Sequence, residues 1–145
     1  MTTQEYLNQL RNIDFEIIAI GSETQSLWDI ATNMHVSYDD IHVDKSPNPG
    51  RMEDIIIQIV DREQKADRKR GRLMKLKLHI EDQIKKMDDR LLYALLWWTY
   101  HDGCRIHEMS KRIKYTEKHT RRLIRRAENE FEKKYGEEYL GKKCP

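Results

Sequence analysis

Nine basic side chains crowd into residues 105–126, and their density indicates what chemistry the chain can offer. They are Arg105, Lys111, Arg112, Lys114, Lys118, Arg121, Arg122, Arg125 and Arg126. Only Glu108 and Glu117 oppose them in this stretch. Clustered guanidinium and ammonium groups attract polyanions and donate hydrogen bonds to phosphate oxygens. The stretch therefore predicts a nucleic-acid contact, provided that the fold presents these groups on one face.

The apolar residues of the same stretch have the spacing of two short helices joined by a turn. Ile106, Met109 and Ile113 stand at i, i+3 and i+7, on one face of a first helix. Thr116 can cap a second helix, because its hydroxyl can accept a hydrogen bond from a free amide of the first turn. The apolar face of that helix is predicted to hold Thr120, Leu123, Ile124 and Ala127. Its opposite face is basic, which suits the major groove of DNA.

A run of charges is more often a solvated helix face whose long side chains cover apolar surface. Here the preceding helix, the turn and the cap favour DNA binding instead. For contacts in the groove we expect Lys118, His119, Arg121, Arg122 and Arg125. For phosphate contacts we expect Arg105, Lys111, Lys114 and Arg126, and Thr116 completes the predicted DNA-binding set.

Composition places these residues in a helical protein with a charge asymmetry. The 145 residues suit one ordinary domain or two small units, and glycine and proline are scarce. The net charge of +2 conceals 14 basic against 18 acidic residues in 1–104, and 13 against 7 in 105–145. We therefore predict an all-α fold with a basic module on a mildly acidic body.

Two long heptad patterns precede the basic stretch. The first predicts a helix over about residues 3–34, with the seam Tyr6, Leu10, Ile13, Ile17, Ile20, Thr24, Leu27, Ala31 and Met34. Residues 35–50 contain Pro47, Pro49 and Gly50 and are predicted to form a loop. A second seam follows over residues 52–87. The two seams can pair as an antiparallel hairpin in one chain, or with another copy, and we favour a homodimer through the first seam.

The remaining helices complete the predicted division of the chain. Asp88 and Asp89 cap an apolar helix over residues 90–100, which we expect to be the core helix of the basic module. The last helix is expected to continue to about Tyr135, with Gly136 ending it. The expected units are a hairpin or oligomerisation module over 1–88, a three-helix DNA-binding domain over 89–135 and a charged tail over 136–145.

The sequence offers no catalytic constellation, so we expect a protein that is not an enzyme. It has no nucleophile-elbow, phosphate-loop or dinucleotide fingerprint. His35 and His42 stand among aspartates without the spacing of a known metal site, and no cofactor is expected. Cys104 and Cys144 form no disulfide framework. Without a membrane-spanning run or signal peptide, we expect a cytoplasmic protein.

Residues 88–127 resemble region 4 of bacterial sigma factors. The matching features are an apolar helix ending in Tyr100, the turn glycine Gly103, Glu108-Met109-Ser110, and Thr116 opening a recognition helix. The start of the chain and the segment GRMEDIIIQIVDRE are similar to small phage and prophage regulators of the ArpU and RinA type. The resemblance implies transcription regulation, often of phage late genes, in the cytoplasm of a bacterial host.

Three functions follow as hypotheses from these patterns. The first is a phage-type transcription regulator that binds double-stranded DNA, with bacterial RNA polymerase as a candidate further partner. The second is a DNA-packaging adaptor similar to a terminase small subunit, although in such adaptors the DNA-binding part commonly comes first. The third is a coiled-coil adaptor that contacts RNA polymerase and leaves DNA untouched. We expect the first.

Overall fold

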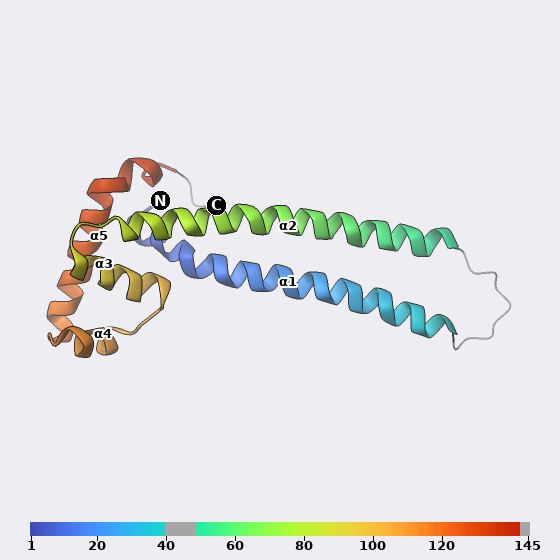
Figure 1. The fold of residues 1–145 in the computed structure, drawn as a ribbon, viewed down its shortest axis with the longest axis horizontal. Helices are drawn as coiled ribbons and strands as arrows, with labels where there is room; N and C mark the ends of the chain where they lie inside the picture. Colours follow the sequence, from blue (N-terminus) through green and yellow to red (C-terminus); the bar gives the residue numbers. More distant parts are fainter. Residues whose placement is uncertain (40–48, 143–145) are drawn as a thin grey trace. The chain divides into compact units, whose positions relative to one another are not determined.

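The computed structural model describes residues 1–39 and 49–142, and no strand occurs among them. The elements are α1 (Thr3–Asp39), α2 (Pro49–Lys85), α3 (Arg90–Leu96), the π-helical turn η1 (Trp97–His101), α4 (Ile106–Ile113) and α5 (Glu117–Tyr139) (Figure 1). The predicted all-α fold is confirmed.

The chain divides into two compact units, and the division differs from the predicted one at residue 88. Unit 1 consists of Met1–Asp14 and Lys75–Pro145, and unit 2 of Phe15–Met74. Both long helices contribute to both units. The helices after residue 89 therefore share a unit with the first turns of α1 and the last turns of α2.

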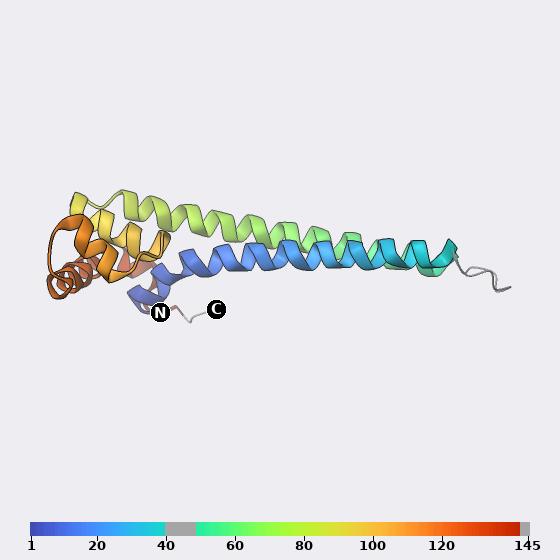
Figure 2. The same cartoon turned by 90° about the horizontal axis from the view of Figure 1, so that it is seen from below.

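Unit 2 is an antiparallel hairpin of one chain. Figures 1 and 2 show its α1 and α2 segments side by side. The Trp28 indole N–H donates to Glu63 at 3.2 Å, and Lys69 pairs with Glu16 at 3.4 Å, so the residue order reverses between the helices. Seam residues are buried between them, namely Ile20, Ala31 and Ile59. The two seams thus pair within one chain, and the first seam is covered without a second copy.

Several predicted boundaries need correction. α1 continues to Asp39 instead of ending near residue 34, and α2 begins at Pro49. Of the predicted loop 35–50, residues 40–48 lie outside the described residues. α5 runs to Tyr139 instead of ending near Tyr135, so the first part of the predicted tail is helical.

Gly136 does not end α5. It is buried inside the helix, and other side chains of α5 occupy the space beside it. A Cβ atom there would lie 2.9 Å from Leu140 Cδ1 and 3.2 Å from Glu132 Cγ. Leu140 closes the helix, with its N–H donating to the Gly136 carbonyl at 2.8 Å. The low helix propensity of glycine is therefore not enough to stop the helix at this position.

The core of unit 1 draws on segments from both ends of the chain. Its buried members are Tyr6, Leu7, Leu10, Ile80, Ile84, Met87, Leu92, Leu96, Tyr100, Ala127, Phe131 and Tyr139. α1 and α2 supply the first five of these, Met87 follows the end of α2, and α5 supplies the last three. Leu7 was not part of the predicted seam, yet it is fully buried because α1 here meets several elements instead of one partner helix.

An aromatic cluster joins the two ends of the chain. The rings of Tyr6 and Tyr139 stack with their centroids 4.3 Å apart, and Phe131 lies 6.2 Å from each. The Thr3 and Tyr139 hydroxyls are hydrogen-bonded at 2.9 Å, and the Tyr6 hydroxyl donates to Gln83 at 2.8 Å. Burial raises the pKa of Tyr6 to about 12, with Glu138 adding to the shift. Such satisfied buried polar groups make the cluster specific as well as apolar.

Replacing Tyr139 tests whether this cluster stabilises unit 1. Tyr139→Ala should lower the free energy of unfolding by ~3–5 kcal/mol, because it removes a buried aromatic ring and leaves a cavity. Glu137→Ala, at an exposed position of the same turn, should change it by less than ~0.5 kcal/mol. Chemical denaturation followed by circular dichroism measures both. Equal stability of the two variants would mean that the end of α5 is frayed, as the sequence suggested.

Candidate nucleic-acid interface

α4 and α5 form a helix–turn–helix whose turn is fixed by local chemistry. α4 ends at Lys114, which has a left-handed backbone conformation with φ 59° and donates its N–H to the Ser110 carbonyl. Tyr115 follows, and Thr116 then opens α5: its hydroxyl accepts from the His119 N–H at 3.2 Å. The predicted cap is confirmed. An N-cap of this kind satisfies a first-turn amide that would otherwise need water.

The two faces of α5 separate as the sequence predicted. Thr120 and Ala127 are fully buried, and Leu123 and Ile124 are half-buried beside them. The Thr120 hydroxyl donates to the Thr116 carbonyl at 2.9 Å, which satisfies this buried polar group. The opposite face presents exposed side chains, namely Lys118, Arg121, Arg122 and Arg125. The first three turns of α5 thus carry their cations towards solvent.

The basic side chains differ in whether a carboxylate already engages them. The Glu117 carboxylate lies 3.5 Å from the Arg121 guanidinium and 3.1 Å from the ring nitrogen Nδ1 of His107 in α4. Lys118, Arg122 and Arg125 make no ion pair with any residue that the structure describes, so their charge is uncompensated. Exposed cations without a carboxylate partner are available to a polyanion, and these three share one face of α5.

The predicted phosphate contacts are also exposed. Arg105 precedes α4 as its N-cap, Lys111 lies in its last turn, and Lys114 is its C-cap. Arg126 is exposed on α5. His119 is exposed as well, and its ring lies 4.7 Å from that of Tyr115. All ten predicted residues therefore lie in α4, in α5 or at a capping position of one of these helices, and none of them is buried.

The carboxylates of α5 are turned to other elements of unit 1. Glu128 accepts the Tyr100 hydroxyl and, at 3.1 Å, the Gln4 side chain. Burial, together with the Glu128 carboxylate, raises the pKa of Tyr100 above its ordinary value. Glu132 accepts the Thr3 hydroxyl. These two carboxylates are therefore engaged by donors from α1 and η1.

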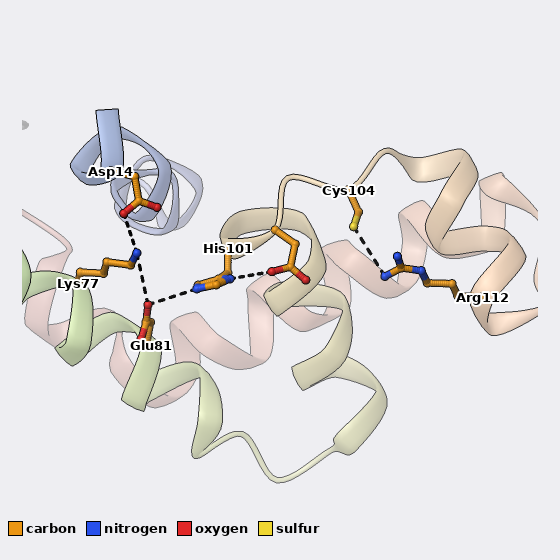
Figure 3. A network of polar contacts seen from close by, with 7 residues as sticks. Asp14, Lys77, Glu81, His101, Cys104 and Arg112 are labelled. Atoms are coloured by element: carbon orange, nitrogen blue, oxygen red, sulfur yellow. Dashed lines mark hydrogen bonds and ion pairs between the residues drawn. The ribbon is translucent and has the colours of Figure 1, made fainter. Parts of the chain in front are cut away.

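A chain of polar contacts supports the turn that leads into α4 (Figure 3). Lys77 of α2 lies 2.6 Å from Asp14 of α1 and 3.9 Å from Glu81. Glu81, which is buried, lies 3.3 Å from His101, and His101 also reaches Asp102 at 2.7 Å. These contacts fasten η1 to α1 and α2. Beyond them, Gly103 has a φ of 67°, which fits glycine at the predicted left-handed turn position.

Arg112 has a structural partner instead of belonging to the basic face. Its guanidinium carbon lies 5.1 Å from the centre of the Trp98 ring. One guanidinium nitrogen lies 3.8 Å from Cys104 Sγ (Figure 3). A cation over an indole ring is attracted to its π face. Arg112 therefore links α4 to η1 through Trp98.

Tyr115 is a residue that the sequence reasoning missed as a site candidate. Its side chain is 50% exposed in the turn just before α5. Tyrosine hydroxyls commonly donate to phosphate oxygens at protein–DNA contacts. The signal was present in the sequence as an aromatic residue between two basic flanks, but its exposure depends on the turn geometry.

Comparisons with models of protein families, with curated proteins and with solved structures find no match to this chain. In residues 1–39 and 49–142, no helix combines the length and apolar character needed to cross a membrane. Nor does this part of the chain hold a cluster of three histidine, cysteine or carboxylate side chains suited to a metal ion. The structure does not describe the side chains of His35 and His42.

The cap of α5 can be tested by stability alone. Thr116→Ala should cost ~0.5–2 kcal/mol, because it leaves the His119 amide without its partner. Thr32→Ala is a matched control in a helix interior, where the Thr32 hydroxyl bonds only to the Trp28 carbonyl at 2.8 Å. That change should be neutral or slightly stabilising, since alanine has the higher helix propensity. If both variants unfold at the same denaturant concentration, the cap does not stabilise α5.

Proposed function

We propose that this chain binds double-stranded DNA through the basic face of α5 and regulates transcription. One observation carries the proposal: Lys118, Arg122 and Arg125 are exposed together on a capped helix and lack ion pairs in the described structure. A helix of this kind fits the major groove, where arginine and lysine donate to guanine O6 and N7. α4 and the turn add cations that would fix the helix against the phosphates.

The kind of regulation follows from the resemblance to sigma factor region 4 and to phage late-gene regulators. We infer a phage-type regulator, acting in the cytoplasm of a bacterial host, that also contacts RNA polymerase. Support comes from the order of the elements. An apolar helix, a glycine turn at Gly103, the short helix α4 and the Thr116-capped helix α5 succeed one another as in the resembled pattern.

Salt dependence is the first test of this proposal. If about six phosphates are neutralised, a plot of log affinity against log salt concentration should have a slope near ~−5, because bound cations release counterions from DNA. Fluorescence anisotropy with labelled duplexes measures the slope. An absence of binding at low salt would contradict the proposal and favour an adaptor that contacts polymerase alone.

Arg122 is the residue whose removal separates binding from folding. Arg122→Ala should weaken binding to the preferred DNA site by ~1–3 kcal/mol if this side chain reads a base, and the melting temperature should not change. Lys133→Ala provides the control, since Lys133 lies further along α5 and pairs with Glu130 at 3.0 Å. Equal affinity of the Arg122 variant and the wild type, with normal folding, would place the contact on another face.

A further inference from the structure

α2 carries a second stripe within unit 2, on the side away from α1. Its members are Ile57, Val60, Gln64, Asp67, Gly71 and Met74, at alternating steps of three and four residues. At 100° per residue they lie opposite the seam that contains Ile59. Ile57 is 65% exposed, Met74 46% and Val60 39%, so these side chains lack cover in the described structure. A heptad stripe in this state predicts a helical partner.

The charges that flank this stripe change sign along α2. Asp61 and Glu63 lie beside its first half, and Arg68 and Arg70 beside its second half. A helix whose acidic half precedes its basic half complements a copy of itself that runs in the opposite direction. We propose that a second copy of this chain binds the stripe antiparallel, with a two-fold axis between residues 65 and 66.

The spacing of the stripe supports this register, because it reads the same in both directions. With the axis at that point, Ile57 of each copy faces Met74 of the other, and Val60 faces Gly71. Gly71 has no side chain and nothing within 4 Å of a Cβ placed there, so it leaves room for Val60. An isologous contact of this kind repeats every pair twice.

The polar residues select antiparallel over parallel pairing. In the antiparallel register Asp67 faces Gln64, whose amide can donate to the carboxylate. In a parallel pair Asp67 would face the same carboxylate of the other copy, which is repulsive. On the flanks, Asp61 meets Arg68 and Glu63 meets Arg70, as such flanking positions do in antiparallel coiled coils.

Glu63 keeps its hydrogen bond from the Trp28 indole, and the ion pairs of the other flanking charges can be exchanged. Asp61 now pairs with Lys65 at 2.9 Å and Arg70 with Asp67 at 2.9 Å, both within one exposed helix. Surface pairs of this type contribute little to stability, so giving them up costs little. Together with the proposed function, a dimer would carry two basic helices and so gain affinity for DNA by avidity.

Sedimentation at low to high micromolar concentration tests the dimer without any DNA. The wild type should approach twice its chain mass of 17.5 kDa. Ile57→Asp should raise the dissociation constant at least ~100-fold, because the charge enters the contact twice. Ile18→Asp is the matched control, at a 68% exposed position on the outer side of α1 in unit 2. It should keep the wild-type mass.

Three outcomes would overturn the proposal: a wild type that stays monomeric at high micromolar concentration, a larger assembly, or a dimer that Ile57→Asp leaves intact. Circular dichroism confirms folding of each variant. The sedimentation experiment contains no DNA. A wild type that failed to bind DNA in a separate assay would refute the proposed function and would not affect the evidence for the dimer.

Cross-linking tests the direction of pairing. In a background with Cys104→Ser and Cys144→Ser, chains carrying Val60→Cys are mixed with chains carrying Gly71→Cys and oxidised. The antiparallel register predicts a disulfide in the mixture and almost none in either variant alone. A parallel dimer would give the reverse, and that result would refute the proposed arrangement.

Discussion

The stacking of Tyr6 on Tyr139 is the contact on which unit 1 depends. Residues from the two ends of the sequence meet there with their ring centroids 4.3 Å apart, and Phe131 lies against both. A three-helix module of α3, α4 and α5 has few residues with which to build a core. By recruiting the first turns of α1 and the last turns of α2, the protein buries enough apolar surface to hold α5 in place.

The positive charge of the candidate interface is concentrated in the first turns of α5. α5 is rich in both signs of charge, and a mixed surface would attract no polyanion strongly. Glu128 and Glu132 face other elements of unit 1, where Tyr100 and Thr3 donate to them. The arginines of the first turns face solvent. These turns are cationic because Lys118, Arg121, Arg122, Arg125 and Arg126 meet only Glu117 there, and the hydrogen-bonded carboxylates lie further along the helix.

α2 carries one apolar stripe and, on another face, a mixed stripe with apolar residues towards its two ends. The stripe that contains Ile59 is buried against α1 within unit 2, and the stripe that contains Ile57 is exposed. Exposed apolar side chains at heptad spacing, flanked by charges that change sign midway, are costly to leave in water. This asymmetry separates a surface that stabilises the hairpin from one suited to a second copy.

Local residue patterns in the sequence determined the all-α fold, both seams, the Thr116 cap and the two faces of α5, because helix periodicity and capping depend on neighbours a few positions apart. Only the tertiary structure decided that the first seam closes within one chain, that α5 continues through Gly136 to Tyr139, and that Arg112 packs on Trp98. It also decided that Glu128 and Glu132 accept hydrogen bonds from Tyr100 and Thr3. These outcomes rest on contacts between residues far apart in the sequence, such as Thr3 with Tyr139, and no local period encodes such contacts.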